Sequence, residues 1–319
     1  MQNNKPLVSF CIPTYGREEK LKKTLESFYI DNNDVDASLY EICISDNSPT
    51  YETKNMLKQY FQEENIVYKR TDAIGFLNSV EALKLGTAVF LKLHNNYTAF
   101  KKGMLSEFIS NVINYMNLKP CMFFTFGYLR KSQDVITLNN FNSFLYKLSY
   151  WSTWSAGFSI WKEDFEKLNN DIEINNMFPH TSFLFRCNCK SQFIIDNKSY
   201  FNNQPTEKKG GYHITKTFCV DYIEMLHVIL IKNIINKKTY KYIKDKLLYE
   251  FFTKWYIDII FNKEKYTFDI SNTNKLLNIY YGKAEKAFFY FLAGVYYLLK
   301  LIKKNIRIIL KKIGLKENI

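Results

Sequence analysis

The feature that most constrains the fold is an apolar run, residues 7–12, that stops at a proline. A turn of residues 13–17 follows, and Leu21, Leu25 and Phe28 then recur at helical spacing. This pattern predicts a buried strand, a turn and an amphipathic helix, the first unit of an α/β sheet. In open sheets of this class, ligands bind at the carboxyl ends of such strands.

Strand-like and helix-like segments alternate after this first unit. Strands are expected at residues 40–46, 66–70, 88–93 and 122–128, and helices at residues 18–28, 53–61, 79–85 and 103–116. Segments of these lengths in alternation predict a mostly parallel sheet with helices on both faces.

Composition and charge limit the class of protein and of partner. The 319 residues are 47% hydrophobic, enough for one large or two modest domains. A net charge of +13 favours anionic partners: nucleotide phosphates, acidic lipid or nucleic acid. Cys11 and Cys43 lie in expected strands and predict buried thiols in a reducing cytosol. Residues 1–6 contain no apolar signal region, so secretion is not expected.

Several motifs resemble a known family. Residues 8–17, followed by the turn of residues 44–48, resemble the opening of a family 2 glycosyltransferase with the GT-A fold, a Rossmann-like sheet. The spacing from Gly75 through Asn78 to Gly86 is also similar to that family. The Ser-Asp-Asn-Ser turn and the segment 154–161 look most like its abequosyltransferase-like branch.

The resemblance implies a domain division. Residues 1–219 are expected to form the GT-A domain, with a nucleotide-sugar half at about 1–100 and an acceptor half at about 101–219. Residues 220–319 are expected to form a helical C-terminal region.

The resemblance also implies a donor site at the first turns. Pro13, Thr14 and Tyr15, in the turn after the first strand, would line the nucleotide pocket. Arg17 would lie near the phosphate or base, or be a solvated first-turn arginine. Asp46 would accept a hydrogen bond from an imide N–H such as that of uracil, or serve as a turn or helix N-cap. Asn78 would steady the loop or contact the ligand.

The segment after residues 88–93 departs from the family pattern. Family members usually carry an Asp-x-Asp motif there, which holds a divalent metal on the diphosphate. This chain has His94, Asn95 and Asn96 instead. Three alternatives remain: His94 and Asn96 hold Mn²⁺ or Mg²⁺, transfer is metal-independent with lysines and arginines stabilising the diphosphate, or these residues only shape the turn.

A general base is expected in the second half. Many family members place an acidic pair before a helix where this chain has Pro179 and His180. The ordinary pKa of histidine, about 6.5, suits proton abstraction near neutral pH. A structural His180 in the first helical turn is the alternative. Glu163 and Asp164 are further candidate bases, or helix-dipole partners.

The acceptor side has an aromatic cluster and a basic loop. Trp154 is the expected acceptor contact, whereas Trp151 and Trp161 are expected in the core. The loop of residues 207–218 could close over the diphosphate or be a solvated linker, and its candidate residues are Lys208, Lys209 and His213.

The C-terminal region is predicted to be helical, at residues 222–235 and 239–261 and beyond. Residues 287–299 are apolar but shorter than the roughly 20 needed to span a bilayer. Residues 300–312 place cations on one side and aliphatic residues on the other, which is typical of an interfacial helix on anionic lipid. Packing on its own domain or on a partner subunit is the alternative.

Together these features predict an inverting glycosyltransferase, cytoplasmic and peripheral on the inner face of the membrane. It would transfer a sugar from a nucleotide donor, preferably a UDP-sugar, to a bacterial surface-glycan or lipid-linked acceptor in capsule or lipopolysaccharide biosynthesis. Nucleic acid is not an expected partner. The alternative is a catalytically degenerate transferase fold that binds membrane or nucleic acid.

Overall fold

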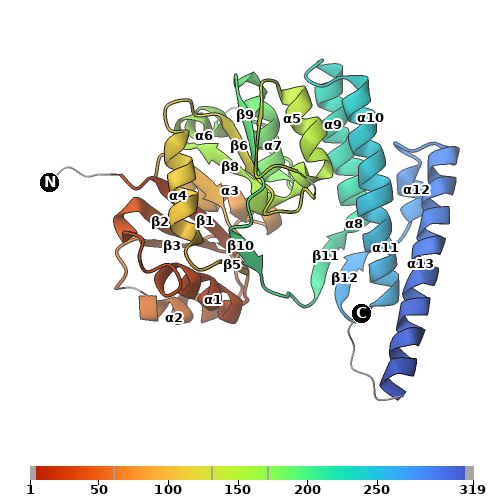
Figure 1. Ribbon diagram of the computed structural model, residues 1–319, viewed down its shortest axis with the longest axis horizontal. Coiled ribbons are helices and arrows are strands. Elements are labelled where there is room, and N and C mark those ends of the chain that lie inside the picture. The colour runs from red at the N-terminus through yellow and green to blue at the C-terminus, as the bar shows by residue number, and fades with distance from the viewer. Residues whose placement is uncertain (1–4, 61, 131, 171, 313–319) are drawn as a thin grey trace. The chain divides into compact units, whose positions relative to one another are not determined.

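The computed structural model describes residues 5–60, 62–130, 132–170 and 172–312, which form two units (Figure 1). Unit 1 comprises the residues up to Thr206 together with Lys232–Thr239. Unit 2 comprises Glu207–Ile231 and the described residues from Tyr240 onward. The division falls at residue 206 instead of 219, because residues 209–213 form a strand that pairs within unit 2.

The main sheet of unit 1 has the strand order β3-β2-β1-β4-β8. The strands are β1 (Val8–Thr14), β2 (Tyr40–Asp46), β3 (Ile66–Arg70), β4 (Phe90–Leu93) and β8 (Ser159–Trp161). The first four are mutually parallel and β8 runs antiparallel to β4. The expected mostly parallel α/β sheet is confirmed, and the carboxyl ends of β1 to β4 meet at one edge.

The helices of the first half follow the sequence pattern closely. They are α1 (Glu18–Tyr29), α2 (Glu52–Leu57), α3 (Asn78–Leu85) and α4 (Met104–Asn114). Helix α1 buries Leu21, Leu25 and Phe28 completely, as its spacing predicts. Helix α3 packs against β1 and β2.

The strand expected at residues 122–128 is shorter and lies in a different sheet. Strand β6 (Cys121–Phe124) belongs to a three-stranded sheet with β9 (Phe193–Asp196) and β7 (Val135–Leu138). The strand ends where Phe126 and Gly127 adopt φ values of 52° and 81°. Two successive left-handed residues reverse the chain, so an extended strand cannot continue through them.

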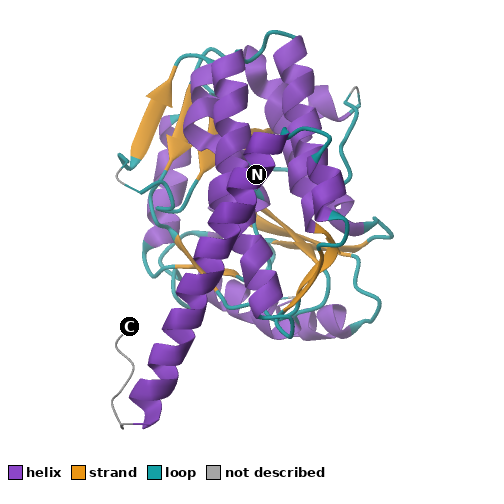
Figure 2. Cartoon of the chain, turned by 90° about the vertical axis from the view of Figure 1, so that its right-hand side faces the viewer, coloured by secondary structure: helices purple, strands orange, loops and turns teal. Residues whose placement is uncertain are grey.

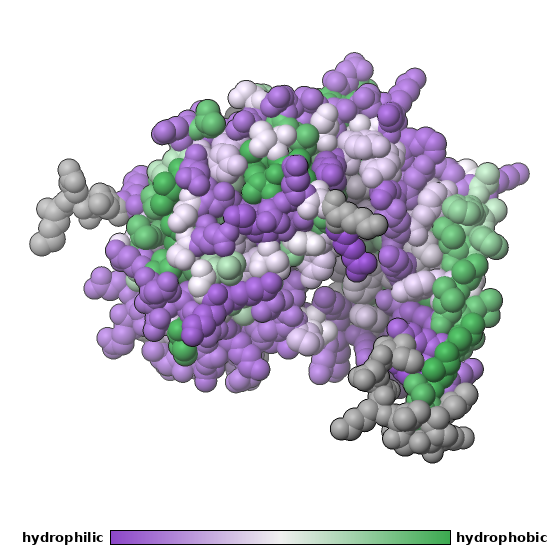
Figure 3. All heavy atoms as spheres, in the orientation of Figure 1, coloured by the Kyte–Doolittle hydropathy of each residue, from purple (hydrophilic) through white to green (hydrophobic). Residues whose placement is uncertain are grey.

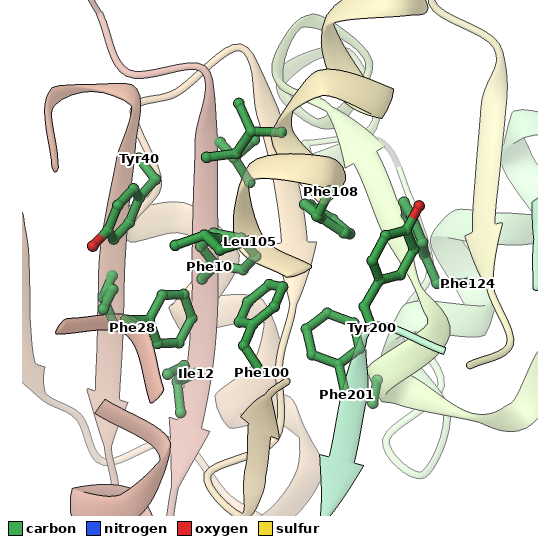
Figure 4. Packing of buried hydrophobic residues seen from close by; sticks show 14 of the residues in the cluster. Phe10, Ile12, Phe28, Tyr40, Phe100, Leu105, Phe108, Phe124, Tyr200 and Phe201 are labelled. Carbon is green, nitrogen blue, oxygen red and sulfur yellow. The ribbon is translucent and has the colours of Figure 1, made fainter. Parts of the chain in front are cut away.

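An aromatic core lies beside the carboxyl end of β4 (Figure 4). Strand β5 (Thr98–Phe100) pairs antiparallel with β10 (Phe201–Asn203). The Phe100 and Phe201 ring centroids are 4.3 Å apart, and the Phe10 and Phe28 centroids are 5.0 Å apart. Burying each such ring stabilises the fold by roughly 1.5–3 kcal/mol. The core therefore fixes the segment after β4 against β10.

The remaining helices of unit 1 are α5 (Phe141–Leu148), α6 (Lys162–Asn169) and α7 (Pro179–Arg186). Pro179 stands in the first turn of α7, where its missing N–H costs no hydrogen bond. The strand and helix expected around residues 158–165 are β8 and the start of α6.

Unit 2 is mainly helical, as expected. Its helices are α8 (Ile214–Lys216), α9 (Ile223–Ile231), α10 (Lys237–Lys246), α11 (Thr253–Phe261), α12 (Thr273–Leu277) and α13 (Lys283–Lys312). A parallel pair, β11 (Lys209–His213) and β12 (Tyr266–Asp269), was not anticipated. Helix α13 joins the apolar and basic C-terminal segments into one continuous helix (Figure 2). None of the helices within the described ranges is long and apolar enough to cross a bilayer.

Candidate functional site

The turns after β1, β2 and β4 are joined by side-chain hydrogen bonds at the carboxyl edge of the main sheet. Asn96 Nδ2 donates to Thr14 Oγ1 over 2.8 Å and to the Gly16 carbonyl over 3.2 Å. The Gly16 N–H donates to Ser48 Oγ over 2.7 Å. Gly16 and Arg17 both have left-handed backbones, with φ values of 62° and 68°. The three turns therefore form one polar surface.

Asn78 connects the turn after β1 to the turn after β2 through hydrogen bonds. Its Nδ2 donates to the Ser45 carbonyl (2.9 Å), to Asn47 Oδ1 (2.9 Å) and to the Thr14 carbonyl (3.3 Å). Its Oδ1 accepts the Ser45 hydroxyl over 2.7 Å. The side chain is buried, and the prediction that it steadies the loop is confirmed.

Asp46 is buried at the end of β2. Its Oδ1 accepts the Ser48 N–H over 2.9 Å, which closes the turn. Its Oδ2 accepts the Tyr68 hydroxyl over 2.8 Å and lies 3.8 Å from Arg70 Nη1. The turn role is therefore confirmed, whereas a contact with the nucleobase stays a prediction.

Tyr68 and Arg70 are site residues that the sequence did not point out. Arg70 donates to the carbonyls of Ser48 (2.7 Å) and Thr50 (2.6 Å), and its guanidinium carbon lies 4.4 Å from the centroid of the Tyr51 ring. Desolvation, followed by the bond to Asp46, raises the pKa of Tyr68 to about 12. The position of Arg70 in the sequence could have indicated its role. It is the last residue of the third strand, and the parallel register places it beside Asp46.

Several groups of the β1 and β4 turns reach solvent at this edge. The Tyr15 side chain is 64% exposed, Arg17 is exposed, and Pro13 and Asn95 are half-buried. The Arg17 guanidinium carbon lies 5.6 Å from the centroid of the Tyr97 ring. A cation and an aromatic ring are thus presented beside the polar turns, a combination suited to an anionic nucleotide.

His94 is a core residue, a position that does not favour a metal ligand, and its metal role stays a prediction. Its Nε2 donates to the Thr98 carbonyl over 2.7 Å, and the ring packs among phenylalanines, including Phe10, Phe28 and Phe100. Desolvation, followed by the charge of Lys92, lowers the pKa of His94 to about 3. The imidazole is neutral and enclosed.

The neighbouring residues do not fit a divalent cation either. Asn96 is buried, and its amide nitrogen is committed to the β1 turn. Within the described ranges, no three His, Cys, Asp or Glu side chains are grouped to hold a metal ion. Neither Mn²⁺ nor Mg²⁺ finds the hard, charged oxygen ligands here that each prefers. His94 and Asn96 thus shape this turn, and the choice between metal-dependent and metal-independent transfer stays a prediction.

Glu163 and Asp164 are wrongly predicted as bases, because they lie at the opposite edge of the sheet. Strand β8 is antiparallel to β4 and places Trp161 beside Phe90, the first residue of β4. The start of α6 is therefore separated from the end of β4 by roughly 10 Å of strand. Glu163 pairs with Lys119 over 2.6 Å and Asp164 with Lys190 over 2.5 Å, so both carboxylates form ion pairs there.

His180 lies on the correct side of the sheet but is buried. Its Nε2 donates to the Thr153 carbonyl over 3.0 Å, and its ring centroid lies 6.3 Å from that of Phe158. The Phe158 carbonyl in turn accepts the N–H of Leu93 at the end of β4. Desolvation lowers the pKa of His180 to about 4. Its role as a base stays a prediction.

The expected basic loop is a strand in unit 2. Lys209 and His213 are the ends of β11, and Lys208 is the exposed residue before it. His213 Nδ1 accepts the N–H of Lys216, capping α8, and Nε2 donates to the Ser271 carbonyl. The flexible-loop expectation is wrong because β12 pairs with this segment, and contact of the lysines with a diphosphate stays a prediction.

The tryptophans divide between core and surface. Trp161 is buried, with Nε1 donating to the Pro120 carbonyl over 2.7 Å, which confirms the core prediction. Trp151 and Trp154 are half-buried, with ring centroids 5.5 Å apart. Trp151 therefore departs from its predicted place in the core.

Known proteins resemble this chain in part of its sequence and in its fold. Residues 9–78 match the model of glycosyl transferase family 2. The abequosyltransferase RfbV of Salmonella typhimurium is 44% identical over 66 residues, which are 20% of this chain and 19% of that protein. The S. aureus TarS 1-349 structure in complex with UDP-GlcNAc has a TM-score of 0.56 and 15% identity, and covers 80% of this chain and 73% of that one.

A second S. aureus TarS structure has a TM-score of 0.54 and 15% identity, covering 78% of this chain and 43% of that chain. The chain thus spans about a fifth of RfbV and less than half of this longer TarS chain. The family match contains β1, β2 and the turns joined by Asn78. The predicted resemblance is thereby confirmed: residues 9–78 match glycosyl transferase family 2, and the α/β fold is similar to that of TarS.

Proposed function

We propose that this protein is a glycosyltransferase that moves a sugar from a UDP-sugar to a glycan acceptor. One observation carries the proposal: the family 2 match coincides with the turns that Asn78 and Ser48 join at the carboxyl edge. A TarS structure holding UDP-GlcNAc and the similarity to an abequosyltransferase support the same reaction class.

The donor nucleotide lies over the β1 and β2 turns in this proposal. Tyr15 and Pro13 line the nucleotide, and Arg17 offsets the charge of the diphosphate. Arg70 holds Asp46 and the β2 turn in place beneath the base. The net charge of +13 adds a long-range attraction for an anionic donor.

The diphosphate is stabilised in this proposal without a cation held by His94 or Asn96. The Nε2 of His94 is committed to a carbonyl, and its ring is enclosed by aromatic side chains. Arg17 is an exposed cation beside Tyr97, a residue of the same turn. A guanidinium can supply charge-assisted hydrogen bonds to phosphate oxygens.

The transfer inverts the anomeric carbon. The acceptor hydroxyl attacks the sugar as the bond to UDP breaks, and the hydroxyl proton passes to a base. His180 is the proposed base, because Glu163 and Asp164 lie at the other edge. With its pKa near 4 the imidazole is neutral at pH 7, so it can accept a proton but holds it weakly.

The acceptor is proposed to be a surface-glycan or lipid-linked intermediate of capsule or lipopolysaccharide biosynthesis, met at the cytoplasmic face of the membrane. Helix α13 exposes an apolar stripe at i, i+3, i+7 spacing, made of Phe288, Phe291, Val295, Leu298, Leu299, Ile302 and Ile306 (Figure 3). Lys303, Lys304 and Arg307 are exposed beside it. Apolar residues beside cations favour binding to anionic lipid.

Nucleotide binding tests the donor proposal. The full chain is titrated with UDP, GDP, CDP and dTDP by thermal unfolding, with Mn²⁺ or with EDTA. UDP is expected to raise the midpoint most, and equally in both conditions. If no nucleoside diphosphate stabilises the protein, the transferase proposal fails; if UDP requires Mn²⁺, the metal-free arrangement fails.

Vesicle sedimentation tests the membrane proposal. Replacing Phe291, Leu298 and Ile302 together with serine is expected to lower binding to phosphatidylglycerol vesicles at least tenfold, because the three exposed side chains lose their apolar contact with lipid. Ile113→Ser, an exposed apolar residue of α4, is the matched control. Equal binding of the wild type and the triple variant would contradict it.

A further inference from the structure

Unit 1 carries a pair of stacked aromatic rings, the exposed Tyr128 and the half-buried Trp151, which we call the aromatic platform. We infer that the aromatic platform binds a sugar ring of the acceptor glycan. The inference rests on the proposed glycosyl transfer and gives its acceptor a place on the chain.

In the aromatic platform, one solvent-exposed ring stacks on a half-buried one. The Tyr128 and Trp151 centroids are 5.2 Å apart with planes 20° from parallel, and Tyr128 is 46% exposed. Trp154 supports both rings, with its centroid 5.3 Å from Tyr128 and 5.5 Å from Trp151. Trp154 itself rests on buried Phe126 at 4.7 Å. Trp154 therefore supports the aromatic platform. The contact with the acceptor sugar, expected of Trp154 from the sequence, is assigned to the exposed Tyr128.

The loop that presents Tyr128 is rigidly held. Phe126 and Gly127 adopt left-handed backbones, and the Tyr128 N–H donates to the Thr125 carbonyl over 2.9 Å. Asn197 clamps the loop: its Oδ1 accepts the Leu129 N–H (3.1 Å) and its Nδ2 donates to the Leu129 carbonyl (3.0 Å). The left-handed backbone of Phe126 is strained, and such a conformation persists only where the surrounding contacts hold it in place. The ring is therefore placed before any ligand binds.

Hydrogen bonds connect the aromatic platform to the turn after β4. The Tyr128 hydroxyl accepts from Asn203 Nδ2 over 3.3 Å, and Asn203 Oδ1 accepts the Thr98 hydroxyl over 2.7 Å. The Thr98 carbonyl accepts from His94. Tyr97 belongs to the same turn, with Arg17 over its ring. The platform is therefore next to the turn where the donor sugar is proposed to lie.

The chemistry of the aromatic platform fits a carbohydrate. Sugar rings present C–H faces that pack on aromatic faces, and their hydroxyls require polar partners at the rim. The exposed Asn203 supplies an amide group at the rim of the rings. Tyrosine and tryptophan combine a large apolar body with a polar end, which suits such mixed surfaces.

The test measures carbohydrate binding directly. Fluorescently labelled full-length protein is applied to an array of bacterial polysaccharides and oligosaccharides. The wild type is expected to bind at least one glycan, and Tyr128→Ala and Trp151→Ala to weaken that binding at least tenfold. Tyr128→Phe keeps the ring and is expected to bind within threefold of the wild type. Ile113→Ala is the exposed apolar control and is expected to bind as the wild type.

Each outcome decides the proposal. Absence of wild-type binding to every glycan, or equal binding by Tyr128→Ala, overturns it. Thermal unfolding identifies a variant that fails to fold; if Trp151→Ala does so, Tyr128→Ala decides alone. UDP titration separates the two proposals: glycan binding that depends on Tyr128, in a protein that no nucleotide stabilises, keeps the aromatic platform and removes the transferase proposal.

Discussion

The carboxyl edge of the main sheet has an inner and an outer layer, and they differ in how their side chains are used. In the inner layer, Asn78, Asn96 and His94 are buried and hydrogen-bonded to backbone groups or to neighbouring side chains. In the outer layer, Tyr15, Arg17 and Tyr128 are exposed. The inner layer shapes the turns, and the outer layer is available to ligands.

This difference shows why motif residues and ligand contacts need not coincide. Asn78 lies within the family match, and it is required here because buried backbone groups need partners. The inner layer should therefore respond to mutation mainly through stability, and the outer layer mainly through binding.

The largest expected effect is in the inner layer. Asn78→Ala leaves the Ser45 carbonyl and hydroxyl and Asn47 Oδ1 without this partner. Because each buried unsatisfied polar group costs about 1–3 kcal/mol, we expect the free energy of unfolding to fall by about 3 kcal/mol in urea denaturation. Tyr15→Ala, exposed in the outer layer, should change it by less than about 0.5 kcal/mol. Equal effects would remove the distinction between layers.

His180 tests whether a buried residue also acts in the reaction. His180→Gln is expected to lower kcat about 100-fold, as for loss of a general base, with UDP binding unchanged. Since burial lowers its pKa to about 4, the wild-type rate should show no inflection near pH 6.5. A variant with full turnover would place His180 among the purely structural residues.

Arg17 tests the outer layer. Arg17→Gln removes an exposed cation beside Tyr97 and should weaken UDP binding about tenfold, which corresponds to about 1.4 kcal/mol. Calorimetric titration measures the affinity, and the thermal midpoint without ligand should stay within about 1 °C of the wild type. Unchanged affinity would exclude Arg17 as the diphosphate contact. Lys5→Gln, an exposed lysine before β1, is the charge control.

The smallest effect concerns the pH dependence of the inner core. Lys92 is fully buried in β4, its Nζ donates to the Leu93 and Ala156 carbonyls, and desolvation lowers its pKa to about 7 from 10.5. Between these values the unfolded chain binds more protons, so stability rises with pH. We expect the free energy of unfolding of the wild type to rise by about 1 kcal/mol from pH 8 to 9. The Lys92→Met variant lacks this titrating group and should not show that rise. Identical pH slopes of the two proteins in urea denaturation would contradict this.

Local pattern predicted much of the donor half. Helical spacing in α1 and the turn role of Asp46 follow from residues near in sequence. The bonds of Asn78 instead join residues 31 and 33 positions away, and the loop that they hold was indicated by the family resemblance. The acceptor half was harder. Because β8 runs antiparallel to β4, Glu163 and Asp164 lie at the edge of the sheet away from the candidate site. No residue of that segment indicates the direction in which its strand runs.

The sequence by itself determined the first strand, its polar turn, the amphipathic helix after it and the family 2 motifs, because these depend on short-range periodicity and residue type. Only the tertiary structure decided that His94 is enclosed by Phe10, Phe28 and Phe100 and that Tyr128 faces solvent beside Trp151. It likewise paired β11 with β12 where a loop was expected. The physical reason is that burial, register and strand direction are set by contacts between distant segments, whose free energies no local pattern contains.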